Sequence, residues 1–339
     1  MHPQGDRNGE SLGEVQPTVQ PTVQPTPRVT AIVVNYNTRD DLVRCLDHLA
    51  RQDEPVEIIV FDNGSRDGSA EAARRCRAAL LRAAAAGRRS PALRLFASPV
   101  NQGYAAASNQ AVGKVQPTVQ PTVQPTVRPT ARGRFILLLN PDAFLPPDGA
   151  RRLADLLESD STLGGVAPQL VGEDGEPQRT CRRLPGTWDL FCELAGLSRV
   201  FPRSGLFNRW KMGDFDHSAS RDEARRVEQV YASCWLLRRD EFIRLGGFDT
   251  RFPIFFNDVD LARRFVLAGK LTLYYPEIRV IHRGGASVRK AGARSVLASH
   301  RAFWRYLRVN GPRFNPLLWI LALPLAVAAP LRVLWREIA

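Results

Sequence analysis

The sequence predicts an α/β fold in which helices cover both faces of a mainly parallel sheet. Short apolar segments without polar alternation recur along the first half of the 339-residue chain, as in strands buried on both faces, and segments of helical periodicity separate them. A polar residue follows each apolar segment. Because ligands of such sheets bind beyond the carboxyl ends of the strands, the same pattern predicts a binding site there.

Four strands and three helices account for this half of the chain. The first strand leads into a helix for which Thr38 is the expected N-cap, with Asp41 three residues later, and Gly87 is expected to end the second helix. The strands are predicted at 28–34, 56–61, 93–98 and 135–139, and the helices after Thr38, over 69–86 and over 104–112.

The polar residues at the strand ends form the candidate site. They are Asn35, Asn37, Asp62, Asn101, Asn140 and Asp142. Each has a structural alternative, since Asp62 also opens a good turn and Asn35 or Asn101 could cap a helix. Four strand ends with Asp or Asn are harder to explain by turns alone, and no glycine-rich dinucleotide motif follows the first strand. A carboxylate at the end of a central strand is suited to hold a cation that bridges a diphosphate.

Composition narrows the function classes. The net charge of +13 favours a polyanionic partner, but the arginines are spread along the chain without interleaved aromatic residues, so we expect no nucleic acid as partner. Five scattered cysteines without a C-x-x-C pair argue against a disulfide framework or a zinc site and fit a reducing compartment. The N-terminal MHPQGDRNGESLGE lacks the apolar segment of a signal peptide, so a cytoplasmic location is expected.

Two copies of the array VQPTVQPTVQPT stand outside the α/β pattern. The first belongs to residues 1–27, which are polar and predicted to be a disordered tail. The second occupies 115–126, and removing 115–130 joins a helix end directly to the strand at 135–139. We therefore expect 115–130 to be an inserted loop that the domain tolerates.

Several segments together carry a resemblance to a known family. The stretches VTAIVVNYNTRDDLVRCLDHL, IIVFDNGSRDGS, NQGYAAASNQAV and LLLNPDAFLPP resemble the inverting family-2 glycosyltransferases of the GT-A fold. Within that family the chain is most similar to the rhamnosyltransferase-like branch. Residues 232–264 and 280–287 resemble the family's acceptor-side and catalytic segments, so the resemblance covers about 28–290 and implies one GT-A domain over that range.

The resemblance implies a nucleotide-sugar donor and roles for the residues that would hold it. Asp62 would hold the nucleoside, and the other residues of that pocket would be Asn35, Asn37, Asn101, Gly103 and Asn109. Asp142 stands where the family's D-x-D motif has its metal-binding aspartate, which implies Mg²⁺ or Mn²⁺ as cofactor. Asn140 replaces the first acid of that motif, so the site should lean on phosphate and water. His282 would approach the metal or the diphosphate, or would be an ordinary hydrogen-bonded histidine at a strand end.

The resemblance also implies a catalytic base. Asp258 is the candidate, preceded by Asn257 where the family usually has Glu. Asp258 should lie near a helix N-terminus, which lowers a carboxyl pKa, whereas neighbouring phenylalanines would raise it by desolvation. The sequence leaves open which effect prevails. Asp260 has a simpler interpretation as the partner of Arg263 or Arg264 on an exposed helix.

The C-terminal region, 291–339, suggests a location. Residues 314–331 contain no charge, but 18 residues are marginal for a span, and Pro324 and Pro330 interrupt them. Interfacial contact, a span and packing on the domain all remain open. The preceding SHRAFWRYLRVN mixes arginine with aromatic residues, as a helix on a membrane surface would. A lipid-linked saccharide acceptor at the inner face of the cell membrane would explain both features.

The resulting expectation is a metal-dependent, inverting glycosyltransferase of cell-envelope polysaccharide synthesis. dTDP-rhamnose is the favoured donor, with a UDP-sugar as an alternative, and a hydroxyl of a saccharide or lipid-linked saccharide is the acceptor. Two other classes stay open. One is an inactive nucleotide-sugar-binding protein, suggested by Asn140 and Asn257 where acids are usual, and the other is a basic nucleic-acid or membrane scaffold, suggested by the net charge.

Overall fold

The structure is a computed structural model that describes residues 26–113, 131–215, 224–284, 286–312 and 314–321. The predictions for most of 1–27, for 115–130 and for 322–331 therefore concern residues outside the described ranges.

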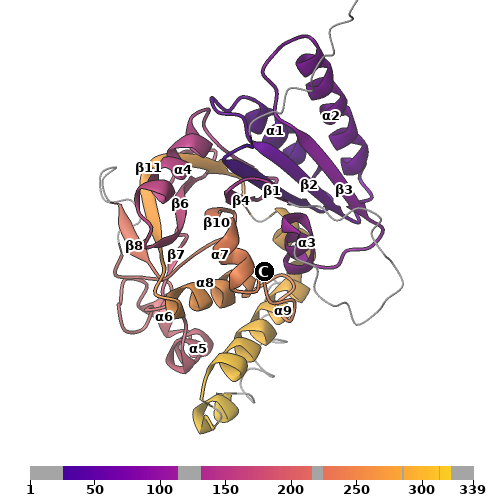
Figure 1. The fold of residues 1–339 in the computed structure, drawn as a ribbon. Helices are drawn as coiled ribbons and strands as arrows, with labels where there is room; N and C mark the ends of the chain where they lie inside the picture. The colour runs from indigo at the N-terminus through magenta and orange to yellow at the C-terminus, as the bar shows by residue number, and fades with distance from the viewer. Residues whose placement is uncertain (1–25, 114–130, 216–223, 285, 313, 322–339) are drawn as a thin grey trace, which may run out of the picture.

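A nine-stranded sheet forms the centre of the molecule (Figure 1). Its order is β3-β2-β1-β4-β10-β6-β11-β5, and β8 pairs with the same edge of β11 as β5 does. Strands β3, β2, β1 and β4 are mutually parallel, and β11 runs parallel to β6. Strand β10 lies antiparallel between β4 and β6. The predicted mainly parallel α/β fold is thus confirmed.

The four predicted strands are the first four of this sheet. They are β1 (Val29–Asn35), β2 (Glu57–Asn63), β3 (Leu93–Ser98) and β4 (Phe135–Leu139). The remaining strands of the sheet are β5 (Ala143–Phe144), β6 (Leu163–Val171), β8 (Arg225–Val227), β10 (Cys234–Arg238) and β11 (Leu271–His282). A separate two-stranded sheet pairs β7 (Cys181–Arg182) with β9 (Gln229–Val230).

Helices cover the sheet on both faces, and alternate residues of each central strand face opposite cores. In β1, Val29, Ala31 and Val33 contact the core under α1 (Arg39–Ala50), α2 (Ser69–Ala85) and α4 (Gly149–Ser159). Ile32 and Val34 contact the other core, under α3 (Tyr104–Val112), α7 (Arg239–Arg244) and α8 (Asn257–Leu267). Burial on both faces is why these strands appear in the sequence as continuous apolar segments.

A third core joins the C-terminal helix to the domain. Helix α9 (Ala286–Asn310) packs Phe303, Tyr306 and Leu307 against the loop before α8 and against α5 (Thr187–Leu194), which α6 (Leu197–Val200) follows. Leu318 and Leu321 join the same core. Part of the aromatic content of SHRAFWRYLRVN therefore packs inside the protein, and its predicted contact with a membrane surface stays a prediction. No helix of the described residues is long and apolar enough to span a bilayer.

The start of α1 differs from the sequence prediction. Thr38 is the N-cap residue, but its hydroxyl does not cap the helix and donates instead to Oδ1 of Asn35 at 2.7 Å. Asp41 accepts from Nη1 of Arg283 at 2.7 Å. Both side chains thus make tertiary contacts in place of helix capping. Thr38 contacts Asn35 at the end of β1, and Asp41 contacts Arg283.

Candidate active site

The ends of β1 and β2 meet at Asn35 and Asp62, which are directly opposite in the strand register. Nδ2 of Asn35 donates to Oδ1 of Asp62 at 2.9 Å and to the hydroxyl of Ser65 at 3.0 Å, and Oδ2 of Asp62 accepts from the Ser65 amide at 3.1 Å. The two side chains are 0% and 2% exposed. These contacts hold the two strand ends and the turn after β2 together.

Asn37 extends this network toward the surface. Its backbone lies in the left-handed region (φ 53°), which asparagine tolerates, and its Oδ1 accepts from the amide of Arg66 at 2.8 Å. The loops after β1 and β2 therefore form one hydrogen-bonded rim. A cavity of about 310 Å³ opens beside this rim, and Asn37, Thr38, Asp41 and Arg283 contribute to its lining.

The third strand end is joined by a residue that the sequence interpretation missed. Nδ2 of Asn63 donates to Oδ1 of Asn101 at 3.0 Å, and Oδ1 of Asn63 accepts from the amide of Gln102 at 3.0 Å. The amide of Gly103 also donates to Oδ1 of Asn101, at 2.9 Å. In the sequence, Asn63 has the character of a turn residue after Asp62. Its position at the end of β2 is the signal that could have shown its role in the site.

Gly103 and Asn109 connect α3 to a loop from the second half of the chain. At Gly103 (φ 86°) a Cβ atom would come within 2.8 Å of the Pro253 side chain. The buried amide of Asn109 donates to the carbonyl of Phe248 at 2.7 Å and accepts from the Phe248 amide at 2.8 Å. Both residues attach α3 to the 248–253 loop, so we infer that they position this loop, and their predicted place in the floor beside base and ribose stays a prediction.

The end of β4 carries Asn140 and Asp142, and the end of β11 brings His282 beside them. Nε2 of Gln178 donates to the His282 carbonyl at 2.6 Å, so Oε1 of the same amide accepts the Nδ1 proton of His282 at 2.7 Å. In neutral His282 this leaves a lone pair on Nε2. In the part of the chain that the structure describes, that atom is buried without a hydrogen-bond partner and lies 3.5 Å from Oδ1 of Asp142.

The donor atoms at the ends of β4 and β11 fit a divalent cation. A buried nitrogen lone pair facing a carboxylate is unfavourable without a cation, so Asp142 and His282 fit Mg²⁺ or Mn²⁺ as a two-residue ligand pair. Nδ2 of Asn140 donates to the Ser233 hydroxyl at 3.1 Å. The amide oxygen of Asn140 is therefore the atom that would act as a third ligand. Within the described ranges no cluster of three or more His, Cys, Asp or Glu side chains could hold a metal. Phosphate and water would have to complete the coordination.

Asp258 is the second residue of α8 and is partly buried. Its Oδ1 accepts from the amide of Val259 at 2.9 Å, and its Oδ2 accepts from Nε2 of Gln229 at 3.4 Å. Burial raises the pKa of Asp258 from 3.8 to about 6, against the opposing effects of backbone hydrogen bonds and of the Arg182 charge. Desolvation thus outweighs the helix N-terminus, which resolves the question that the sequence left open.

The loop before Asp258 is strained. Phe256 has φ 68°, a left-handed conformation that is unfavourable for a bulky residue by about 1–3 kcal/mol. Its ring is held at centroid distances of 5.8 Å from Trp210, 4.9 Å from Phe303 and 5.6 Å from Tyr306. Asn257 is buried and donates to the carbonyl of Ile254 at 2.8 Å. Packing and this hydrogen bond together fix the backbone that presents Asp258.

Asp260 has a structural partner, as predicted. Its Oδ2 accepts from Nε and Nη2 of Arg264 at 2.9 and 2.6 Å, while Arg263 instead donates to the carbonyl of Asn310. The expectation of an exposed helix face was wrong, because Asp260 is buried. Arg264 also donates to the carbonyls of Leu245 and Gly247. The pair therefore joins α8 to the loop after α7.

Part of the chain matches a family of known proteins, and most of it is similar to one named relative. Residues 30–119 match the family model described as glycosyl transferase family 2. Over 305 residues the chain is 28% identical to an N-acetylglucosaminyl-diphospho-decaprenol L-rhamnosyltransferase of Mycobacterium tuberculosis, a match that covers 89% of this chain and 92% of that protein. The chain contains a glycosyl transferase family 2 domain.

Solved structures agree on the fold of this glycosyltransferase. A mannosyltransferase from Pyrobaculum calidifontis, in complex with GDP-Man and Mn²⁺, matches with a TM-score of 0.51 and 22% identity over 89% of this chain and 74% of that one. GalNAc-T7 with UDP, GalNAc and Mn²⁺ also matches with a TM-score of 0.51, at 15% identity over 76% of this chain and 44% of that one. At these identities the likeness concerns the fold alone.

Two residues beside Asp258 in the glycosyltransferase were missed by the sequence interpretation. Arg182 is buried on β7, its guanidinium lies 4.7 Å from the Tyr231 ring centroid, and its Nη2 donates to the Tyr231 hydroxyl at 2.6 Å. Gln229 is buried on β9 and contacts Asp258. Both come from two-residue strands, and Arg182 is one of many arginine pairs in the sequence, so no local pattern distinguishes them.

Proposed function

We propose that this protein is an inverting, metal-dependent glycosyltransferase that moves rhamnose from dTDP-rhamnose to a hydroxyl of a lipid-linked saccharide. The observation that carries the proposal is a pair of carboxylates in opposite surroundings. Asp142 lies 3.5 Å from a buried histidine nitrogen that has no hydrogen-bond partner among the described residues, as a cation ligand would, whereas desolvation raises the pKa of Asp258 to about 6, as in a general base. Transfer with inversion needs these two functions on opposite sides of the anomeric carbon.

On the donor side, the proposal assigns Asp142, His282 and Asn140 to hold the cation. Bound there, Mg²⁺ or Mn²⁺ would neutralise the charge that develops on the departing nucleotide diphosphate. Because Mg²⁺ prefers oxygen ligands, the imidazole of His282 favours Mn²⁺. Asn35, Asn37, Asp62 and Asn101 would form the rim for the nucleoside, with Asn35 and Asp62 acting mainly by keeping the two loops in place.

On the acceptor side, Asp258 would accept the proton of the attacking hydroxyl. A carboxyl with a pKa of about 6 is ionised at pH 7 and is a stronger base than an ordinary aspartate. Gln229 donates to Oδ2 of Asp258 and the Val259 amide donates to Oδ1, so the carboxylate is held in a fixed orientation. A carboxylate with a raised pKa and a fixed orientation favours an enzyme over an inactive nucleotide-sugar-binding protein.

The choice of sugar and acceptor rests on the relative that matches nearly end to end. That mycobacterial protein is named for transferring L-rhamnose to N-acetylglucosaminyl-diphospho-decaprenol. By analogy we propose rhamnose as the sugar, a polyprenyl-diphosphate-linked N-acetylglucosamine as the acceptor, and the inner face of the cell membrane as the place of reaction. The role would be in cell-envelope polysaccharide synthesis.

The test is transfer by the purified full-length chain. A short-chain polyprenyl-diphospho-N-acetylglucosamine would be offered with dTDP-rhamnose, UDP-glucose or GDP-mannose, with Mn²⁺, Mg²⁺ or excess chelator. We expect acceptor-dependent release of dTDP with Mn²⁺, a product whose anomeric configuration is opposite to that of the donor, and little release with chelator. Equal activity with excess chelator would contradict the metal role, and release from UDP-glucose or GDP-mannose alone would replace the proposed donor.

A further inference from the structure

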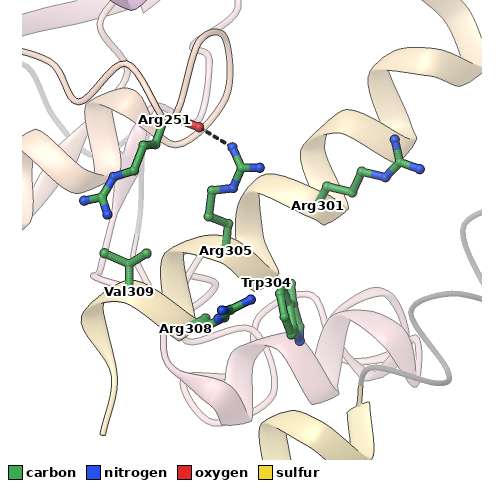
Figure 2. A pocket seen from close by; sticks show the side chains of 6 residues that line it. All are labelled: Arg251, Arg301, Trp304, Arg305, Arg308 and Val309. Atoms are coloured by element: carbon green, nitrogen blue, oxygen red, sulfur yellow. Dashed lines mark hydrogen bonds between the residues drawn. The ribbon is translucent and has the colours of Figure 1, made fainter. Parts of the chain in front are cut away.

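A cluster of arginines lines a cavity on the exposed side of α9, away from the site described above. Arg301, Arg305 and Arg308 follow one another at helical spacing and lie on one face of the helix. Together with Trp304 they line a cavity of about 400 Å³, as Figure 2 shows. We call Arg301, Trp304, Arg305 and Arg308 the α9 groove.

The charge of the α9 groove is not neutralised within the described residues. None of the ion pairs found there involves Arg301, Arg305 or Arg308, and the 25 residues of α9 include no Asp or Glu. Arg305 donates to the carbonyl of Arg251 at 2.6 Å, and Arg308 stacks on Trp304 at 5.4 Å from the ring centroid. Three neighbouring cations without a carboxylate attract an anion with several oxygens, such as a phosphate.

An apolar surface adjoins the α9 groove. After α9 the chain buries Leu318 and Leu321 in the third core, yet neighbouring apolar side chains are exposed, Phe314 at 80% and Ile320 at 68%. Trp319 is also exposed, and its ring meets that of Trp304 at 5.7 Å between centroids. The arginines and the exposed apolar side chains therefore form one continuous surface.

We propose that the α9 groove binds the phosphates of anionic phospholipid headgroups, with the apolar side chains at 314–320 inserted among the acyl chains. Cations at headgroup depth, a tryptophan at the interface and apolar residues below it are the arrangement that a bilayer surface selects. This surface would hold the protein at the membrane where the proposed reaction takes place, and in this it rests on the proposed function. Nucleic acid fits the arginines but leaves the exposed apolar residues unexplained.

The geometry also relates this surface to the catalytic loop. The opposite face of α9 carries Phe303 and Tyr306, whose rings hold the strained Phe256 two residues before Asp258. One helix would therefore contact lipid with its arginine face and support the base with its aromatic face. A membrane-bound acceptor would then meet Asp258 at a fixed height above the bilayer.

The test is vesicle co-sedimentation of the full-length chain without any donor or acceptor. The vesicles would be pure phosphatidylcholine, or phosphatidylcholine with about one third phosphatidylglycerol. The variant is Arg301→Gln with Arg305→Gln and Arg308→Gln. Its matched control is Arg77→Gln with Arg82→Gln and Arg88→Gln, which removes the same charge from exposed arginines in and after α2, at the other end of the molecule (Figure 1).

We expect the wild type and the control to prefer the anionic vesicles and the groove variant to lose that preference. Each arginine near an anionic surface contributes about fivefold to partitioning, so the triple change should weaken binding on the order of a hundredfold. Binding to pure phosphatidylcholine should stay unchanged, because it depends on apolar residues. If the triple variant does not fold, Arg301→Gln alone, at a side chain without a hydrogen bond among the described residues, should still weaken binding about fivefold.

Equal loss in the groove variant and the control would show that only net charge matters and would overturn the proposal. An unchanged anionic preference in the groove variant, or displacement of vesicles by duplex DNA at equal phosphate concentration, would overturn it as well. Because no turnover is measured, a failure here is distinguishable from a wrong donor, acceptor or base. A chain that transfers rhamnose but ignores anionic vesicles would refute the α9 groove and leave the proposed reaction standing.

Discussion

Two corners of the site are equally buried but differ in how their polar atoms are used. At the ends of β1 and β2, the polar side-chain atoms of Asn35 and Asp62 have partners within the chain. At the ends of β4 and β11, Nε2 of His282 has none, although His282 and Asp142 are each 7% exposed. Satisfied buried groups stabilise the fold, whereas an unsatisfied one calls for a ligand. The difference separates residues that build the site from those proposed to contact the leaving group.

The same contrast recurs two residues apart on α8. Asp260 is neutralised by Arg264, whereas among the described residues Asp258 has hydrogen bonds but no ion pair, and desolvation raises its pKa. Asp260 stabilises the fold through its ion pair, whereas Asp258 is the carboxylate proposed to accept a proton. The following predictions would break or sharpen these comparisons.

The largest effect is expected from Asp258→Asn. Turnover should fall by about 10²–10⁴, because the amide keeps the shape of the side chain but cannot accept a proton. Donor binding, measured by thermal shift with nucleotide and Mn²⁺, should stay near that of the wild type. A variant that retains most of its rate would show that Asp258 is not the base.

The pH dependence of the wild type sharpens this test. Turnover should decline as the pH falls through about 6, since protonated Asp258 cannot accept the hydroxyl proton. Stability should follow the opposite sign. Between pH 3.8 and about 6 the native state binds more protons than the unfolded chain, so this group lowers stability as the pH rises. Asp258→Asn removes that loss and should be at least as stable as the wild type at pH 7 in urea unfolding.

Asp260→Asn should show the reverse behaviour. Removing one partner of a buried ion pair costs about 3–5 kcal/mol, because Arg264 keeps its charge without a carboxylate. Urea unfolding should therefore show a loss of roughly 3 kcal/mol, while the folded fraction retains most of its turnover. Comparable stability of the two variants would contradict the distinction between these aspartates.

Asp142→Ala tests the cation corner. A nucleotide at about a hundred times its Kd stabilises a protein by about 2.7 kcal/mol, and we expect the Mn²⁺-dependent part of that stabilisation to disappear. His282→Gln should reduce it less, since Asp142 supplies the charge. Asn35→Ala is the contrasting variant, because it should lower the melting temperature but keep the dependence on Mn²⁺. Loss of metal dependence in Asn35→Ala alone would reverse the assignment of the two corners.

The smallest effect is expected from deleting 115–130. Loop length contributes only about 0.6 kcal/mol per doubling, so the melting temperature and nucleotide binding should remain close to those of the full chain. Loss of folded protein on deletion would mean that this segment packs on the domain.

The sequence was most informative where local pattern and tertiary environment agree. Strands β1, β2 and β4 are buried on both faces, so their apolar segments and the polar residues after them were visible without the structure. The roles of Gly103 and Asn109 depend on Pro253 and Phe248, more than a hundred residues away along the chain, and no local pattern reports such contacts. The pKa of Asp258 likewise depends on how far packing excludes water, which residue identity alone does not determine.

One hydrogen bond has a consequence for how relatives of this chain can differ. The amide of Ala131 donates to the carbonyl of Val112 at 3.3 Å, so the chain leaves α3 and returns toward β4 at a single point. The residues between include tandem copies of Val-Gln-Pro-Thr. Tandem repeats gain and lose copies when DNA polymerase slips during replication. Strains carrying this gene are therefore expected to differ in length here by multiples of four residues.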